Sequence, residues 1–257
     1  RKVIYEDGRG MAKHAGDDWF MSFGELLELG RRQPSDIFGT EAALGHPDDV
    51  CHFSLTSGTT GLPKGAQRSK MSPFASALLL DRIPLPQRSA MVIVSPIFHS
   101  TGFALWGVGT ALGNKTVVMR RFDAEKTLAA IAEHKAEVLV AVPTMLHRMV
   151  ALGPDVIGKY DLSSLKIVVL AGSALSPTLS EAIQDTFGDV LYNLYGSTEV
   201  SWASIAQPQE LEAHPTTAGK APMATTLKVV DEHGNDVPEG EVGRVFVGND
   251  LLFDGYT

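Results

Sequence analysis

Short apolar runs recur along the chain, and glycine, proline or charged residues bound each of them. Runs of this kind are typical of strands that are buried on both faces of a parallel sheet. We therefore expect strands at residues 53–56, 90–95, 115–119, 136–142 and 165–172.

Two windows between these runs have a helical pattern instead. In residues 176–188, Ser176 suits the N-cap, Pro177 the first helical position and Gly188 the C-terminal cap. Residues 123–134 have a similar pattern. Strands and helices in alternation predict an α/β fold with largely parallel sheets flanked by helices.

The pattern changes after about residue 216. The stretch TTLKVVDEHGNDVPEGEVGRVFVGN is typical of two β segments joined by Gly, Asn and Pro turns, with no helical period between them. We therefore divide the chain into a lead-in segment at 1–45, an α/β core at 46–216 and the start of a small β-barrel-like subdomain at 217–257.

Composition narrows the class of protein. The 257 residues are 44% hydrophobic, enough for one large domain or two small ones. The net charge of −8 argues against a nucleic-acid-binding protein, which needs a basic surface. A single cysteine, Cys51, excludes an internal disulfide and fits a reducing cytosol. No apolar run approaches the ~18 residues of a membrane span. We expect a cytoplasmic protein, with peripheral membrane association left open.

The stretch LTSGTTGLPKGAQRSK, residues 55–70, contains what a phosphate-binding loop needs, but in an unusual order. In a P-loop the lysine follows the last glycine and precedes Ser or Thr, whereas here Lys64 follows Pro63 and precedes a glycine. We expect the loop to leave the C-terminal end of a parallel strand at 53–56, the edge at which open α/β sheets bind ligands. Glycine N–H groups, hydroxyls and Lys64 would then hold phosphates, although an ordinary Gly-rich turn has the same composition.

The string TSGTTGLPKG at 56–65 resembles the signature of the adenylate-forming superfamily, which contains acyl-CoA synthetases, luciferases and the adenylation domains of peptide synthetases. Three more stretches resemble motifs of that superfamily in the same order: PIFHSTG at 96–102, AGSAL at 171–175 and NLYGSTEV at 193–200. The resemblance extends over about residues 45–257. It implies part of the large N-terminal domain of an acyl-CoA synthetase.

The resemblance also implies roles for individual residues. The expected catalytic residues are Lys64, His99, Thr198 and Glu199. The expected ATP-binding residues are Thr56, Ser57, Gly58, Thr59, Thr60, Gly61, Lys64, Gly172, Ser173, Ala174, Asn193, Tyr195, Gly196 and Thr198. The expected acyl-binding residues are Phe98, His99, Phe103, Leu105 and Trp106. Thr56 and Glu199 would share Mg²⁺.

Elementary chemistry is compatible with these roles. Tyr195 offers a flat face on which adenine would stack, and Glu199 offers the hard oxygen ligand that Mg²⁺ prefers. His99 would orient the substrate carboxylate, which needs no deprotonation near pH 7. Taken alone, Glu199 would also suit a helix N-terminus, where an acidic side chain interacts favourably with the helix dipole. Phe103 and Trp106 are equally compatible with core packing.

The implied reaction has two steps. A carboxylate attacks the α-phosphorus of ATP to give an acyl-adenylate and pyrophosphate, and coenzyme A then takes the acyl group. The segment FHSTGFALWG carries no acid to pair with a substrate ammonium, and it differs from the HDMGL segment of fatty acyl-AMP ligases. We therefore expect a medium- or long-chain fatty-acid–CoA ligase, an acid–thiol ligase, with an aryl-acid–CoA ligase or a fatty acyl-AMP ligase as alternatives.

Family members continue beyond the point that matches residue 257, with an Asp that grips the ribose and a small domain that carries an essential Lys. We therefore expect this chain to be a piece that does not complete the reaction alone, and that self-associates into homo-oligomers through exposed apolar surface. A non-catalytic ATP- or acyl-binding fragment is the alternative from another class. A P-loop hydrolase is disfavoured because Lys64 is misplaced for it.

Overall fold

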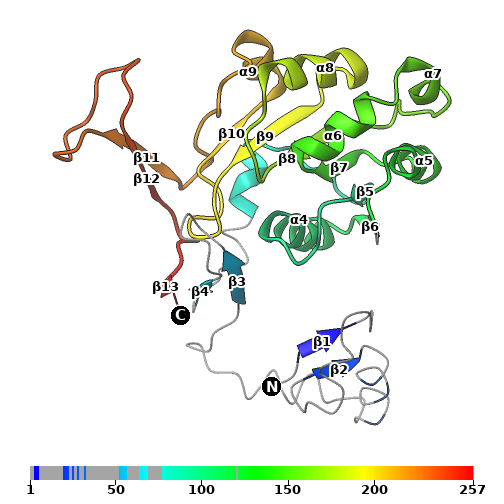
Figure 1. Cartoon of the computed structure of the whole chain (residues 1–257), viewed down its shortest axis with the longest axis horizontal. Helices are drawn as coiled ribbons and strands as arrows, with labels where there is room; N and C mark the ends of the chain where they lie inside the picture. Colours follow the sequence, from blue (N-terminus) through cyan, green and yellow to red (C-terminus); the bar gives the residue numbers. More distant parts are fainter. Residues whose placement is uncertain are drawn as a thin grey trace. The chain divides into compact units, whose positions relative to one another are not determined.

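The computed structural model describes residues 3–5, 20–22, 25, 28, 32, 52–56, 64–68, 77–119 and 121–256, with the backbone alone at 3–5, 20–22, 52–56 and 64–65 (Figure 1). The chain divides into two units, Arg1–Asp49 and Val50–Thr257. In the first unit, β1 (Val3–Tyr5) pairs in parallel with β2 (Phe20–Ser22). The second unit contains all four motifs.

A six-stranded sheet forms the centre of the second unit, in the order β10-β9-β8-β7-β5-β6. Its strands are β5 (Ala90–Ile93), β6 (Lys115–Val118), β7 (Val138–Ala141), β8 (Ile167–Leu170), β9 (Leu191–Tyr195) and β10 (Ser204–Ala206). All neighbours pair in parallel except β10, which is antiparallel to β9. The four strands predicted from residue 90 to residue 172 are confirmed, as is the largely parallel α/β fold.

Helices connect these strands. They are the 3₁₀ helix η2 (Leu78–Asp81) and the α-helices α4 (Ser100–Ala111), α5 (Ala124–His134), α6 (Pro143–Val150), α7 (Pro154–Ile157), α8 (Pro177–Phe187) and α9 (Pro208–Ala213). The predicted caps of α8 are confirmed: Ser176 Oγ accepts a hydrogen bond from the Leu179 N–H at 3.2 Å, and Gly188 has a φ of 82°. The second predicted helix is α5, with Asp123 as its N-cap.

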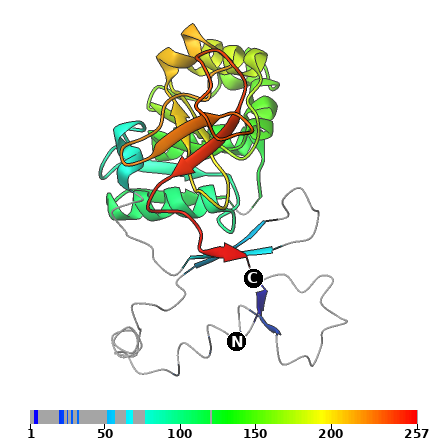
Figure 2. The same cartoon turned by 90° about the vertical axis from the view of Figure 1, so that its left-hand side faces the viewer.

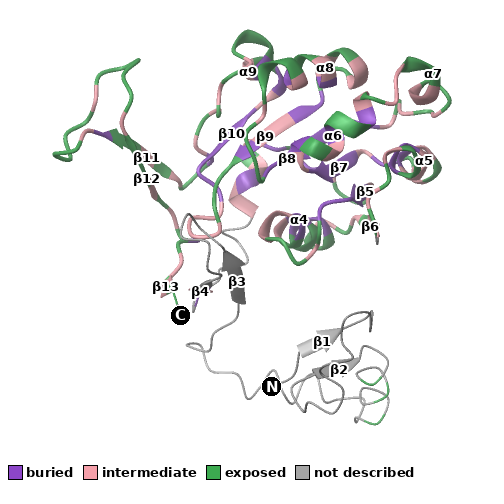
Figure 3. Ribbon diagram, viewed as in Figure 1, coloured by how far each residue is buried: buried purple, intermediate pink, exposed green. Residues whose placement is uncertain are grey.

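The sheet buries both faces, because successive residues of a strand point to opposite sides. Met91 and Ile93 of β5 belong to one apolar cluster, which α4 and η2 cover. Val92 belongs to the other cluster, which α5, α6, α8 and α9 cover. In Figure 1, α4 lies below the sheet and α6 and α8 lie above it, and Figure 3 shows the strands between them as buried.

Helix α4 contains three glycines, and two of them allow close approaches, Gly109 to β5 and Gly102 to the loop that follows β5. A Cβ atom at Gly109 would lie 2.2 Å from Met91 Sδ, and one at Gly102 would lie 2.5 Å from the Pro96 carbonyl oxygen. Any larger residue would push the helix away. Glycine also lowers helix propensity, which explains why no helix was predicted there.

A separate three-stranded sheet corrects one prediction (Figure 2). Strand β3 (His52–Thr56) is not parallel and does not join the central sheet; it pairs antiparallel with β4 (Lys64–Arg68), which pairs in turn with β13 (Gly255–Tyr256). A four-residue apolar run does not distinguish parallel from antiparallel strands. Strand β4, KGAQR, has few of the residues that favour strands. The Gly-rich loop is therefore the connection of a hairpin.

The two β segments expected after residue 216 are present. Strand β11 (Thr226–Val230) pairs antiparallel with β12 (Arg244–Gly248), and most of this hairpin is exposed (Figure 3). The chain then returns to the three-stranded sheet through β13, so pairing crosses the predicted boundary at residue 216. Within the described residues, no helix combines the length and apolarity needed to cross a membrane.

Candidate active site

Three of the four motifs follow the C-terminal ends of strands in the central sheet. Residues 96–102 follow β5, 171–175 follow β8, and Gly196 follows β9. Because parallel strands end at the same edge, this edge is where an open α/β sheet binds ligands. The topology thus brings together motifs that lie far apart in the sequence.

His99 is held at this edge by its place in the fold. It is the N-cap of α4, and its Nδ1 accepts a hydrogen bond from the Thr101 N–H at 3.4 Å. A Cβ atom on Gly172, which has a φ of 95°, would lie 3.9 Å from His99 Cε1. Two predicted groups, the histidine beside the carboxylate and the glycine beside adenine, are therefore neighbours.

The phosphate loop is described only at its ends. Thr56 ends β3 and Lys64 begins β4, and these two residues are Cα partners across the hairpin. The predicted phosphate-binding residues between them lie outside the described residues; these are Ser57, Gly58, Thr59, Thr60 and Gly61. The roles of Thr56 and Lys64, whose side chains are not described, stay predictions.

The predicted adenine residues lie on two neighbouring strands. Ser173 and Ala174 are exposed in the loop between β8 and α8, while Asn193 in β9 pairs with Leu170 at the end of β8. Tyr195, the last residue of β9, is 50% exposed, so part of its side chain is accessible to a ligand.

Gly196 begins a tight turn that carries Thr198 and Glu199. A Cβ atom at Gly196 would lie 2.0 Å from the Ser201 carbonyl oxygen, so the turn closes only around glycine. Thr198 and Glu199 are half-buried in this turn. The motif therefore depends on glycine for its backbone path as well as for access to a ligand.

Glu199 is the acid of this edge that is best suited to a cation. Burial raises the pKa of its carboxyl, but hydrogen bonds with Ser197 and Tyr256 and the charge of Arg68 outweigh burial, and the pKa lies below its ordinary value. The carboxylate is therefore ionised at neutral pH. No three His, Cys, Asp or Glu residues gather into a metal site in the described part of the chain. A divalent cation at Glu199 would thus take most of its ligands from phosphates and water.

Arg68, which the sequence did not single out, ties three parts of the site together. Its side chain is 4% exposed. Its Nε donates a hydrogen bond to the Leu251 carbonyl oxygen at 2.8 Å, and its Nη2 donates to the Thr198 carbonyl oxygen and to Ser201 Oγ. It therefore joins the strand that begins with Lys64 to the turn that carries Glu199.

Residues 249–256 are a second part of this site that the sequence did not single out. Their side-chain and backbone N–H groups donate hydrogen bonds to the turn that carries Glu199 and to β4. The hydrogen bonds run from Asn249 Nδ2 to the carbonyls of Val200 and Trp202 (3.0 and 3.1 Å), from the Phe253 N–H to the Glu199 carbonyl (2.9 Å), and from the Asp254 N–H to the Gln67 carbonyl (2.8 Å). No local pattern signals them, because the partners are far apart in the chain.

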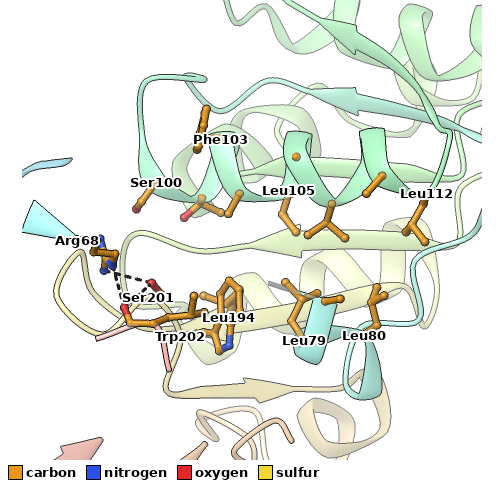
Figure 4. Close-up of a pocket in the computed structure, with 17 residues that line it drawn as sticks. Arg68, Leu79, Leu80, Ser100, Phe103, Leu105, Leu112, Leu194, Ser201 and Trp202 are labelled. Atoms are coloured by element: carbon orange, nitrogen blue, oxygen red, sulfur yellow. Dashed lines mark hydrogen bonds between the residues drawn. The ribbon is translucent and has the colours of Figure 1, made fainter. Parts of the chain in front are cut away.

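An apolar cavity of about 400 Å³ lies between α4, η2 and β9 (Figure 4). Its walls are mainly Leu, Val and Ala side chains, and Ser100, Thr101 and Arg68 line it as well. Two predicted acyl-binding residues, Phe103 and Leu105, line this cavity.

Phe98 and Trp106 do not line the apolar cavity, and their acyl-binding roles stay predictions. Phe98 precedes the helix and is 95% exposed. Trp106 comes one helical position after Leu105, about 100° around the helix axis, and is 39% exposed. Its ring instead contacts that of Phe103, with the centroids 5.8 Å apart.

Comparison with known proteins agrees with this arrangement. The family described as AMP-binding enzyme matches residues 9–257. The medium/long-chain-fatty-acid–CoA ligase FadD8 of Mycobacterium tuberculosis is 30% identical over 233 residues, which cover 89% of this chain and 40% of that protein. The 2-succinylbenzoate–CoA ligase of Bacillus licheniformis is 29% identical over 219 residues, 84% of this chain and 44% of that protein. The chain spans less than half the length of these curated relatives.

Solved structures share the fold. The N-terminal domain of FACL13 from Mycobacterium tuberculosis, bound to an inhibitor, matches 99% of this chain and 65% of that chain with a TM-score of 0.84 at 23% identity. The anthranilate CoA ligase AuaEII, in complex with anthranoyl-AMP, matches 100% of this chain and 51% of that chain with a TM-score of 0.83 at 24% identity.

Proposed function

The chain belongs to the AMP-binding enzyme family, and from this premise we propose that its protein is a fatty-acid–CoA ligase. It would activate a medium- or long-chain fatty acid with ATP and then transfer the acyl group to coenzyme A. The observation that carries the proposal is the apolar cavity, which adjoins the residues that follow His99. Its volume of about 400 Å³ falls within the ~300–1,000 Å³ common for small-molecule sites.

The lining of the cavity favours an uncharged tail. Most of its described lining is aliphatic, and Arg68, the one charged residue among the described lining residues, donates hydrogen bonds to the carbonyls of Thr198 and Leu251. No acid is among these described lining residues, so a substrate ammonium would find no partner among them. Burial of methylene groups in such a cavity is favourable by up to ~0.8 kcal/mol for each group.

The residues at the sheet edge would then position the reaction. His99, fixed as the N-cap of α4, would orient the substrate carboxylate toward the α-phosphorus of ATP. Tyr195 would stack on adenine, Thr198 would contact the α-phosphate, and Lys64 would neutralise charge on the departing pyrophosphate. A Mg²⁺ ion held by Glu199 and Thr56 would supply further charge neutralisation. In reactions at phosphorus, positioning and charge neutralisation provide most of the catalysis.

Calorimetric titration of the 257-residue chain with non-hydrolysable acyl-adenylate mimics tests this proposal. Acetyl, benzoyl and dodecanoyl mimics share the nucleotide and differ in the acyl group. We expect the dodecanoyl mimic to bind tightest, because each buried methylene contributes up to ~0.8 kcal/mol, or about fourfold in affinity. Tightest binding of the benzoyl mimic would instead identify an aryl-acid ligase. Equal affinity for all three would contradict an acyl role for the cavity.

A further inference from the structure

Tyr256 makes a side-chain contact with the acid of the site. Its phenolic O–H donates a hydrogen bond to Glu199 Oε1 at 2.8 Å. The two residues lie 57 positions apart. Tyr256 belongs to β13, where its backbone partner is Ala66 of β4. The hydroxyl therefore comes from the strand beside the one that begins with Lys64.

Both partners of this hydrogen bond are fixed independently. The Glu199 carbonyl accepts a hydrogen bond from the Phe253 N–H at 2.9 Å, and the preceding carbonyl, of Thr198, accepts one from Arg68. The Tyr256 ring packs edge-on against the Phe253 ring, with centroids 4.9 Å apart. The Glu199 backbone and the Tyr256 ring are thus each held by contacts other than this hydrogen bond.

A glutamate side chain otherwise samples several rotamers, and ordering it when a ligand binds costs free energy. A hydrogen bond to one carboxylate oxygen selects one orientation of the group in advance. Outer partners of this kind commonly tune how well a carboxylate holds a cation.

We propose that Tyr256 is a positioning residue, which orients the Glu199 carboxylate for the divalent cation that accompanies ATP. This rests on the proposed function, in which Glu199 holds that cation. Tyr256 does not touch the reacting atoms in this role; it acts through Glu199.

The test compares Tyr256→Phe with Tyr160→Phe in the 257-residue chain. Tyr160 is a matched control, because its O–H donates to Glu125 Oε1 at 3.0 Å and neither residue belongs to the four motifs. Binding of ATP is titrated by calorimetry with Mg²⁺ and, separately, with EDTA, and thermal unfolding is recorded for each variant. We expect Tyr256→Phe to weaken binding of Mg·ATP by about three- to tenfold, the typical net effect of losing one hydrogen bond in an exposed pair. Binding in EDTA should stay within about twofold, and Tyr160→Phe should change neither.

A double-mutant cycle with Glu199→Gln separates this role from a structural one. If Tyr256 acts through Glu199, Tyr256→Phe has no further effect on Mg·ATP binding in the Glu199→Gln background. Equal losses with Mg²⁺ and with EDTA, additive losses in the cycle, or no loss at all would each overturn the positioning role alone. Failure of the unchanged chain to bind Mg·ATP would instead overturn it together with the proposed function.

Discussion

The two faces of the central sheet have similar apolar surfaces but differ in how helices cover them. One face packs against α5, α6, α8 and α9. The other packs against α4 and η2 and retains the apolar cavity. Helix α4 lies close to β5 at Gly109, and the cavity lies between this helix and η2. Stability and ligand binding are thus divided between two sides of the same strands.

The largest expected effect tests this division directly. Leu139, on β7, is fully buried on the closed face, whereas Leu105 is equally buried but lines the cavity. We expect Leu139→Ala to lower the free energy of unfolding by about 2–5 kcal/mol. Leu105→Ala should cost less, because its side chain already borders empty space and loses fewer contacts. Urea denaturation measures both, and equal losses would contradict the division.

Titration with the acyl-adenylate mimics sharpens the same comparison. Leu105→Ala should change the relative affinities for the dodecanoyl and acetyl mimics, since it enlarges the cavity. Leu139→Ala should leave their ratio unchanged in protein that is still folded, because its side chain faces away from the cavity.

A pair of glycines in α4 provides the next test. A Cβ at Gly109 would lie 2.2 Å from Sδ of the fully buried Met91, whereas a Cβ at Gly107 would have no atom of the described residues within 4 Å apart from its own stretch of helix. We expect Gly109→Ala to cost about 1–2 kcal/mol net and Gly107→Ala to stabilise by about 0.5–1 kcal/mol through helix propensity. Thermal unfolding of the two variants distinguishes these outcomes. A shift in the same direction for both would show that contact with β5 does not set the position of α4.

The smallest expected effect on stability concerns an ion pair. It connects the segments that cover the two faces of the central sheet, near the edge strand β10. Arg82, just after η2, donates to Glu210 of α9. Burial raises the pKa of the Glu210 carboxyl. The Gln207 N–H and the charges of Arg82 and Lys220 lower it by more, so the pKa lies below its ordinary value. The folded protein then binds the proton more weakly than the unfolded chain. The stabilisation is present above the unfolded-state pKa and is lost as pH falls through the folded-state pKa.

Replacing Glu210 by Gln should therefore make the free energy of unfolding less dependent on pH on the acid side. Urea denaturation at a series of pH values from 7 down to 3 would measure this. If the free energy of unfolding of the variant fell with pH as steeply as that of the unchanged protein, Glu210 would not contribute to the pH dependence of stability.

Local patterns in the sequence predicted the features whose causes are local. The buried strands from residue 90 onward and the caps of α8 follow from periodicity and from single residues such as Ser176 and Gly188. The four motifs were identified in their order along the chain, but that three of them meet at one edge of the central sheet follows from the topology.

The remaining features depend on contacts between distant residues. Helix α4 has three glycines and no polar face, and its existence depends on packing against β5. Strand β4 has the largely polar sequence KGAQR, and its position is set by pairing with β3 and β13. The hydrogen bond from Tyr256 to Glu199 has no local signal at all.

The antiparallel pairing of β13 with β4 also constrains the order in which the protein is made. Arg68 and its hydrogen-bond partner Leu251 are 183 residues apart. At a synthesis rate of about 5–20 residues per second, the hairpin that carries the Gly-rich loop leaves the ribosome roughly 10–40 s before its third strand. All strands of the central sheet, from β5 to β10, are made within that interval, so the three-stranded sheet is the last part of this unit to be completed.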